Sequence, residues 1–207
     1  MSGLCLILSG APECYIPKRC RQADYIIACD HGYAHSLRHG VEPDLVVGDF
    51  DSYDGHIAIG LEVIRTIPEK DDTDTMMGLK EAIARGYKNI VVAGGLGGRI
   101  DHMMANIGLL VYAADQGVMC QLVDQHHQIF SLRNGSCRIK RGQWKNVSIF
   151  AADTEVPGVT LEGFKYPLEN YTLTSHFPLG VSNEFAEDEA RITVGDGTLI
   201  VILTDQK

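Results

Sequence analysis

The chain has 207 residues, of which 45% are hydrophobic and 22% charged, a composition typical of a folded globular protein rather than a disordered or collagen-like chain. Its 18 basic and 27 acidic residues give a net charge of -9, which argues against a general nucleic-acid binder, because such proteins present a basic surface. No apolar run approaches the roughly 20 residues that a membrane helix needs, and residues 1–10 lack the basic start of a secretory signal. We therefore expect a soluble, cytoplasmic protein with one large domain or two small ones.

The first 125 residues alternate between short apolar runs and helical patterns. The apolar runs predict buried strands at 4–8, 25–29, 45–47, 63–67, 90–93 and 119–123, because they are β-branched and lack polar alternation. Apolar residues at helical spacing predict helices at 73–85, followed by Gly86 as a C-cap, and at 101–116. Strands that alternate with helices in this way predict an α/β domain with a parallel sheet.

From about residue 126 the pattern changes to short runs with strand-like alternation. Such runs occur at 137–139, 147–150, 159–161 and 172–174. Near the end, runs at 191–194 and 198–203 flank glycines at 195 and 197, which predicts a terminal hairpin. We expect residues 126–207 to form an antiparallel β-sandwich domain, closely docked to an α/β domain of residues 1–125.

The cysteines and histidines carry little functional information. The six cysteines contain no C-x-x-C pair, so we expect neither a zinc site nor a disulfide framework, and most should be small core residues. His31, His35 and His39 recur every four residues and would align on one face of a helix. Because they lack acidic or thiol partners at ligand spacing, they do not predict a zinc site.

A glycine-rich loop lies between the strand at 90–93 and the following helix. The chain has neither the P-loop pattern nor the dinucleotide-binding fingerprint, but four of residues 94–98 are glycine and Arg99 follows. Glycines at the start of a helix allow backbone N–H groups to approach an anion closely. The loop therefore predicts a phosphate-binding segment, with an ordinary flexible connection as the alternative.

Two acids, Asp49 and Asp51, follow a buried strand. If the backbone stays extended, both side chains point the same way, at the end of the strands where open α/β sheets bind ligands. Two neighbouring carboxylates repel unless a cation lies between them, and oxygen ligands favour magnesium. The alternative is a pair of solvated loop acids.

Further acids follow other strands or begin helices. Asp30 follows the strand at 25–29, Asp71 and Asp74 precede the helix at 73–85, and Asp101 begins the next helix. The acids at 71–74 alone could equally be N-caps. If these ends converge, they form an acidic, metal-binding cleft opposite the glycine-rich loop, an arrangement suited to phosphoryl or pyrophosphoryl transfer.

Six motifs together resemble those of the bacterial-type thiamine pyrophosphokinase family. In chain order they are CDHGYAH at 29–35, PDLVVGDFDS at 43–52, KDDTD at 70–74, GGLGGRIDH at 94–102, GFKYPL at 163–168 and GVSNEF at 180–185. The resemblance covers nearly the whole chain. It implies transfer of the pyrophosphoryl group of ATP to thiamine, giving thiamine diphosphate and AMP, with Mg²⁺. It also implies an α/β domain followed by a β-sandwich, and homodimers whose active sites are shared between subunits.

The resemblance assigns roles to particular residues of this chain. Asp49, Asp51 and Asp74 would hold magnesium and the polyphosphate, with Asp71 and Asp101 nearby, and Gly97, Gly98 and Arg99 would lie along the nucleotide. Ser182 and Asn183 would reach thiamine from the partner subunit. No residue stands out as a general base, although Asp101 and Asp74 are candidates. The acidic cleft suits thiamine electrostatically, because its thiazolium ring is positively charged.

Three alternatives use the same residues differently. In a phosphatase of the haloacid dehalogenase type, Asp49 would be a nucleophile that forms an aspartyl-phosphate. A metal-dependent glycosyltransferase would use the Asp-x-Asp pair to hold a nucleotide sugar. In a non-catalytic binding protein, the acids would serve only solubility. Release of AMP from ATP would exclude the phosphatase and the glycosyltransferase, because neither chemistry makes AMP from ATP, and a binding protein would have no turnover to lose when Asp49 is substituted.

Overall fold

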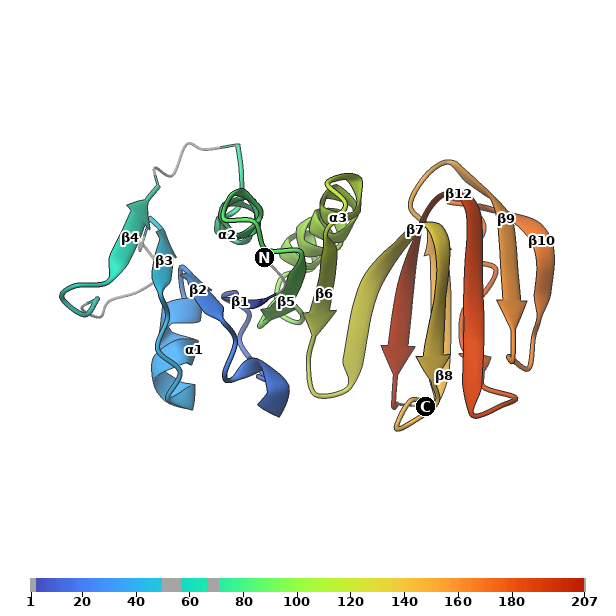
Figure 1. The fold of residues 1–207 in the computed structure, drawn as a ribbon, viewed down its shortest axis with the longest axis horizontal. Helices are drawn as coiled ribbons and strands as arrows, with labels where there is room; N and C mark the ends of the chain where they lie inside the picture. The colour runs from blue at the N-terminus through green and yellow to red at the C-terminus, as the bar shows by residue number, and fades with distance from the viewer. Residues whose placement is uncertain (1–2, 50–56, 67–70, 207) are drawn as a thin grey trace. The chain divides into compact units, whose positions relative to one another are not determined.

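The computed structural model describes residues 3–49, 57–66 and 71–206. The chain divides into two compact units, residues 1–125 and residues 126–207, each with its own strands (Figure 1). Each unit also has its own core of buried apolar side chains. Among the described residues, no helix has the length and apolar character that crossing a membrane requires.

Within the described part of residues 1–125, six parallel strands form one sheet in the order β4-β3-β2-β1-β5-β6. The strands are β1 (Leu4–Leu8), β2 (Tyr25–Cys29), β3 (Leu45–Gly48), β4 (Glu62–Arg65), β5 (Asn89–Ala93) and β6 (Met119–Val123). The prediction of a parallel α/β arrangement is confirmed. The prediction of a buried strand at 63–67 is wrong in its burial, because β4 lies at the edge of the sheet and is partly exposed, and residue 67 lies outside the described residues.

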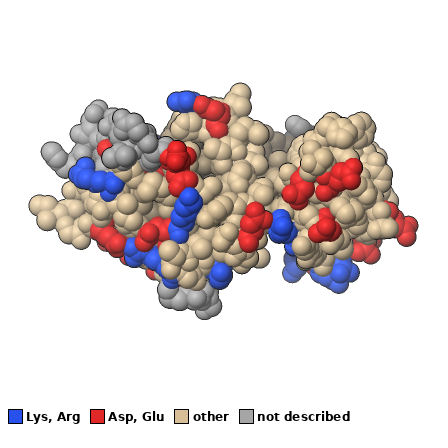
Figure 2. Space-filling view, turned by 90° about the horizontal axis from the view of Figure 1, so that it is seen from above, with Lys and Arg blue, Asp and Glu red and all other residues tan. Residues whose placement is uncertain are grey.

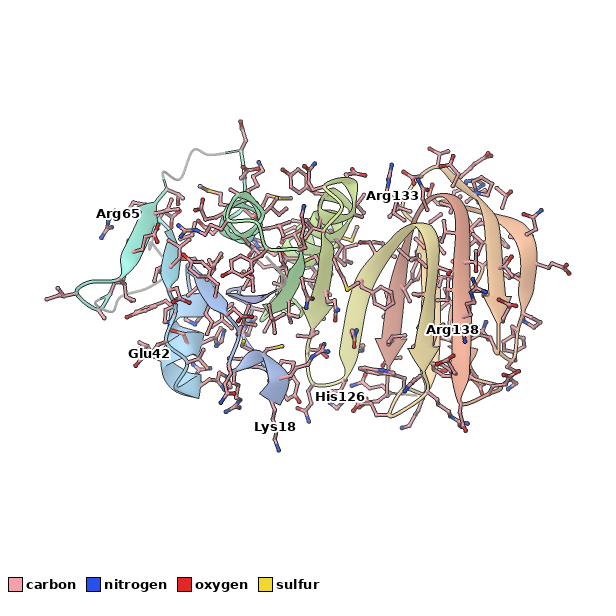
Figure 3. All side chains as sticks on the ribbon, in the orientation of Figure 1. Lys18, Glu42, Arg65, His126, Arg133 and Arg138 are labelled. Carbon is pink, nitrogen blue, oxygen red and sulfur yellow. The ribbon has the colours of Figure 1, made fainter. Side chains whose placement is uncertain are left out.

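Helices cover both faces of this sheet. In Figure 1, α2 (Asp74–Ala84) and α3 (Ile100–Asp115) lie on one side, and α1 (Gly32–His39) and the short 3-10 helix η1 (Lys18–Cys20) lie on the other. Side chains fill the space on both sides (Figure 3). The two helices predicted from apolar spacing match α2 and α3 to within a residue at each end, whereas α1 and η1 were not predicted.

Close packing explains one glycine in α2 and the burial of most cysteines. A Cβ atom on Gly78 would lie 2.6 Å from the Cys29 Sγ atom, so glycine allows α2 to approach the sheet. All six cysteines are free thiols, and four of them are buried, as expected for small core residues.

Residues 126–207 form antiparallel strands around a second core. The strands are β7 (His127–Lys140), β8 (Asn146–Ala151), β9 (Glu155–Glu162), β10 (Leu168–Thr174), β11 (Asn183–Glu184) and β12 (Glu189–Thr204). β12 pairs with β7 along its whole length, with β9 in its first half and with β8 in its second half. The prediction of antiparallel strands in this unit is confirmed.

The predicted hairpin at 191–203 is wrong, because these residues belong to the single strand β12. Its pairing with β7 continues on both sides of a register shift between Val194 and Thr198, which is a bulge rather than a turn. The Asn134 Oδ1 atom accepts a hydrogen bond from Gly197 N (2.7 Å), and the Asp153 Oδ2 atom accepts one from Thr198 N (2.7 Å). These side chains replace ladder partners that the bulge removes, so the glycines allow a local irregularity and not a reversal.

Charged side chains of both signs share the surface. On the face drawn in Figure 2, Lys and Arg side chains are interspersed with Asp and Glu side chains over the described residues.

Candidate functional site

A cavity of about 670 Å³ lies at the carboxyl ends of the strands in residues 1–125. From β1 the chain adds β2, β3 and β4 on one side, and it then returns to add β5 and β6 on the other side of β1, so the direction of the sheet reverses between β1 and β5. Such a reversal point opens a crevice in which α/β proteins bind ligands. The loops after β1, β2 and β5 and the starts of α2 and α3 line the cavity. The lining residues are 9–12, 30–31, 73–75, 94–95, 97–99, 102 and 106.

Backbone hydrogen bonds join the loop after β1 to the glycine-rich loop after β5. Ser9 N donates to Ala93 O and Ala11 N donates to Gly94 O, both at 2.8 Å. Gly94 has φ of 69°, and a Cβ atom there would lie 2.6 Å from Ser9 O, so this position requires glycine. On the far side of the loop, Asn106 Nδ2 donates to Gly95 O at 2.8 Å. The two loops therefore form one connected wall of the cavity.

The start of α2 brings a carboxylate into the cavity. Thr73 caps the helix by accepting a hydrogen bond from Met76 N at 3.2 Å, so the capping role belongs to the threonine and not to a neighbouring acid. Asp74, the first helical residue, lines the cavity and accepts a hydrogen bond from the Thr66 hydroxyl at 3.2 Å. The buried Thr75 hydroxyl lies 2.6 Å from that of Ser9, which ties this turn to the end of β1.

At the start of α3, Arg99 and Asp101 form a two-point ion pair. The Arg99 Nε atom donates to Asp101 Oδ1 (3.1 Å) and Nη2 donates to Oδ2 (2.6 Å). The hydrogen bonds from Arg99, together with that from His102 N, hold the pKa of Asp101 at about 2. Both side chains are more than 60% exposed, so the pair contributes little to stability and Arg99 can be drawn to another anion at small cost.

Acids predicted from the other strand ends lie at different places. Asp30 lines the cavity with φ of 49°, and its N–H donates to Val47 O at 2.8 Å. Asp49, half-buried, follows β3 at the next position after Gly48, whose carbonyl accepts a hydrogen bond from Thr66 N. Asp71 is exposed and does not line the cavity. Asp51 lies outside the described residues.

Ser182 and Asn183 belong to residues 126–207 and differ in burial. Ser182 is exposed with φ of 57°, and its N–H donates to the Ser148 hydroxyl at 3.0 Å. Asn183 is only 4% exposed. Its Oδ1 atom accepts hydrogen bonds from Tyr166 N and Glu184 N, both at 3.0 Å, and its Nδ2 atom donates to Tyr166 O at 2.7 Å. The two residues therefore present different chemistry: a solvent-facing hydroxyl and a buried amide that holds a backbone segment.

The aspartate side chains of this unit are of the chemical type that binds magnesium. Within the described residues, no group of three or more His, Cys, Asp or Glu side chains is arranged to hold a metal ion. Magnesium, however, is usually held by one or two carboxylates together with substrate phosphates and water. Asp74 and Asp49 supply carboxylates of the required type. Thiol chemistry is disfavoured, because burial raises the pKa of every cysteine, to about 12 in Cys5 and Cys14.

The cavity can hold an anionic chain of phosphates. Two helices begin at its edge, and their unpaired N–H groups and dipoles favour negative charge. The structure brings five of the sequence-predicted residues to this cavity, namely Asp30, Asp74, Gly97, Gly98 and Arg99. Sequence reasoning missed the segment at 9–12, because its place in the cavity depends on strand order, which the sequence does not reveal.

Comparisons with known proteins agree over both units. Residues 16–122 match the family model "Thiamin pyrophosphokinase, catalytic domain", and residues 136–199 match "Thiamin pyrophosphokinase, vitamin B1 binding domain". Thiamine pyrophosphokinase of Bacillus subtilis (strain 168) is 30% identical, with 95% of this chain and 96% of that protein covered. The crystal structure of thiamine pyrophosphokinase from Bacillus subtilis superposes with a TM-score of 0.90 at 29% identity, covering 99% of this chain and 100% of that one. A thiamin pyrophosphokinase family protein from Enterococcus faecalis gives 0.84 at 30% identity, with both chains fully covered.

Proposed function

The chain belongs to the thiamine pyrophosphokinase family, and on that premise we propose that its reaction takes place in the cavity of residues 1–125. The function follows from the family: the chain is an enzyme that transfers a pyrophosphoryl group to thiamine. We infer that ATP is the donor, so that thiamine diphosphate and AMP are the products. One observation carries the location, namely that the glycine-rich loop and the start of α2 face the same cavity at the reversal point of the sheet.

We propose that the nucleotide phosphates bind along Gly97, Gly98 and Arg99. Both glycines have positive φ values, 86° and 75°, which allow the backbone to turn close to a ligand. Arg99 supplies a guanidinium group that suits phosphate oxygens. Asp30, which follows β2, also lines the cavity, and we assign it to the nucleotide site as well.

We propose that Asp74 holds magnesium together with Asp49 and Asp51, with Asp71 close by. Magnesium supplies charge neutralisation and orientation of the phosphates. Asp74 is supported by its place on the cavity wall and by the Thr66 hydroxyl, which fixes one of its oxygens. A carboxylate with a pKa of about 2 is a weak base, so Asp101 suits the positioning of Arg99 better than removal of the thiamine proton.

We propose further that residues 1–125 form the catalytic domain and that residues 126–207 bind thiamine through Ser182 and Asn183. The enzyme would then be a homodimer with active sites shared between subunits, as the family resemblance implies. We also propose that the antiparallel strands form a sandwich, since β12 pairs with β9 in one half and β8 in the other around one apolar core. The six free cysteines suit a reducing compartment such as the cytoplasm.

A product assay tests the reaction. Purified protein is supplied with ATP, thiamine and Mg²⁺, and AMP is resolved from ADP. We expect AMP and thiamine diphosphate to form in equal amounts. ADP with thiamine monophosphate would contradict pyrophosphoryl transfer. Absence of thiamine-dependent turnover would favour the phosphatase, glycosyltransferase or binding-protein alternatives.

Mixing two impaired variants, assayed at a thiamine concentration at which each alone shows little turnover, tests the shared sites. One carries Asp74→Asn, and the other carries Ser182→Ala with Asn183→Ala. In a dimer with shared sites, random exchange gives half mixed dimers, each with one intact site, so activity should return to about a quarter of the wild-type value. Sites confined to single subunits would show no recovery.

A further inference from the structure

His35 is a fully buried histidine on α1 that does not line the cavity. Its Nε2 atom lies 2.8 Å from the carbonyl oxygen of Ala11. Because a carbonyl oxygen can only accept, Nε2 must carry the proton and donate it. Burial lowers the pKa of His35 and the neighbouring His31, Arg38 and His39 lower it further, which favours the neutral ring over the charged one. The structure therefore defines one tautomer, with Nδ1 unprotonated.

The polar ring is costly at this position. Its Nδ1 atom is buried and, among the described residues, has no hydrogen-bond partner. An unpaired buried acceptor is unfavourable, and an apolar side chain of similar size would avoid that cost. Within the part of the chain that the structure describes, the hydrogen bond to Ala11 is thus the polar interaction that a histidine supplies here and an apolar residue cannot.

The residue that His35 holds belongs to the cavity wall. Ala11 and Pro12 line the cavity, and Ala11 N donates to Gly94 O at 2.8 Å. A Cβ atom on Gly98 would lie 2.8 Å from the Pro12 ring, so the glycine-rich loop packs directly on this segment. A shift of Ala11 would therefore displace Gly94 through the hydrogen bond and Gly98 through its contact with Pro12.

We propose that His35 is a positioning residue for nucleotide binding: its Nε2–H holds the carbonyl of Ala11 and thereby fixes the wall formed by the loops after β1 and β5. This inference rests on the proposed function, because it takes the cavity to be the nucleotide site. His35 acts through the backbone of Ala11 and touches no ligand. Its effect should consequently appear in nucleotide affinity and not in the chemical step.

Two substitutions separate the hydrogen bond from packing. His35→Leu fills the space without a donor, whereas His35→Gln retains an N–H group that can reach the carbonyl. Loss of one buried hydrogen bond should raise the KM for ATP about tenfold in His35→Leu, with kcat and the KM for thiamine unchanged within about twofold. His35→Gln should stay within about threefold of the wild type. His39→Leu, on the same helix, is the matched control and should leave all three constants unchanged.

Binding of α,β-methylene ATP, measured by calorimetry, gives a readout independent of turnover. The dissociation constant should follow the same order, with His35→Leu weakest. If His35→Leu does not fold, His35→Met replaces it as the variant without a donor. Equal nucleotide affinity in the wild type, His35→Leu and His35→Gln would overturn the inference, even if unfolding temperatures differed. A wild-type enzyme that binds the analogue but makes no AMP would instead contradict the proposed function.

Discussion

The cavity of residues 1–125 and the Ser182–Asn183 segment of residues 126–207 are built in different ways. In the cavity, the predicted residues Asp74, Gly98 and Arg99 lie on the lining itself. In the other segment, only the Ser182 side chain faces solvent, while Asn183 is 4% exposed and bonded at both ends of its amide. One motif can therefore contain two kinds of residue: those that can touch a ligand and those that hold the backbone beside it.

The buried amide of Asn183 has a definite structural task. It joins the backbone of Tyr166, in the connection between β9 and β10, to Glu184 of β11, next to the bridge between Phe164 and Phe185. Tyr166 itself is 59% exposed, so the amide fixes the backbone of a side chain that reaches solvent. If this segment binds thiamine, Asn183 acts by holding its backbone, which is the kind of role proposed for His35 in the other unit.

The largest effect is expected in the cavity, from Asp74→Asn. The amide keeps the shape and can still accept from Thr66, but it removes the charge proposed to hold magnesium. We expect kcat to fall by roughly 100-fold or more, with stability nearly unchanged because Thr73 caps the helix. Steady-state kinetics at saturating Mg²⁺ and ATP measures this. Asp72→Asn, which removes only an exposed ion pair with Lys80, should stay within about twofold.

If the kcat of Asp74→Asn stays within a few-fold of the wild-type value, the proposal that Asp74 holds magnesium is contradicted. The cavity would then resemble the Asn183 segment, in which a motif residue acts by holding its neighbours. That outcome would contradict the contrast between a cavity lined by ligand-binding residues and a segment in which Asn183 holds the backbone.

The next effect is on stability, from Asn183→Ala. The substitution leaves the Tyr166 N–H and carbonyl groups without their buried partner, which should lower the free energy of unfolding by about 2–4 kcal/mol. Ser182→Ala should change it by less than about 0.5 kcal/mol, because the side chain is exposed. Urea denaturation followed by fluorescence suits this unit, since the single tryptophan, Trp144, packs against its core.

Kinetics on the same two variants distinguishes a residue that contacts thiamine from one that holds the backbone. If Ser182 contacts thiamine, Ser182→Ala should raise the KM for thiamine more than the KM for ATP while leaving stability intact. A larger effect on the KM for ATP would move thiamine away from this segment. Equal destabilisation by both substitutions would contradict the division into a contacting residue and a holding residue.

A smaller effect is expected from Gly98→Ala, with Gly97→Ala as its match. Both glycines have positive φ, so alanine costs roughly 1–2 kcal/mol of backbone strain at either position. At Gly98 the new methyl group would also collide with Pro12, whereas at Gly97 no atom of the described residues lies within 4 Å of it. We expect Gly98→Ala to raise the KM for ATP about tenfold and Gly97→Ala to raise it less. Equal KM values would show that the Pro12 contact does not shape the nucleotide site.

Local pattern predicted much of residues 1–125. The runs at 4–8, 25–29 and 119–123 coincide with β1, β2 and β6, because buried parallel strands are continuously apolar and end at polar or glycine residues. The bulge in β12 was mistaken for a turn, since its two supporting side chains, Asn134 and Asp153, come from distant parts of the chain.

Contacts between distant parts of the chain also limit what the sequence predicts about the candidate site. Glycine and acid spacing predicted Gly98 and Asp74 as site residues, because a glycine-rich run and the start of a helix can be recognised within a short stretch of sequence. The role of His35 depends on Ala11, 24 residues away, and on the central position of β1 in the sheet. The helical spacing of the histidines was visible, but the atom that His35 contacts was not.

The smallest effect concerns the pKa of Asp101, which is about 2 beside Arg99. Because the folded pKa lies below the ordinary value of 3.8, the ionised carboxylate favours the folded state above pH 3.8, and this contribution is lost as the pH falls toward 2. Carboxyl ¹³C NMR titration measures the value directly. Arg99→Gln should return the pKa toward 3.8, since the hydrogen bonds from Arg99 are the main cause of the shift.

Nucleotide binding turns this titration into a test of the cavity. If phosphate draws Arg99 away, Asp101 loses its partner, and its pKa should rise when α,β-methylene ATP is added in the absence of metal. The exposed pair costs little to separate, whereas the buried bonds of Asn183 and His35 are costly to break. An unchanged pKa would mean that Arg99 stays on Asp101, and Arg99 would then join the residues that shape the site without contacting the nucleotide.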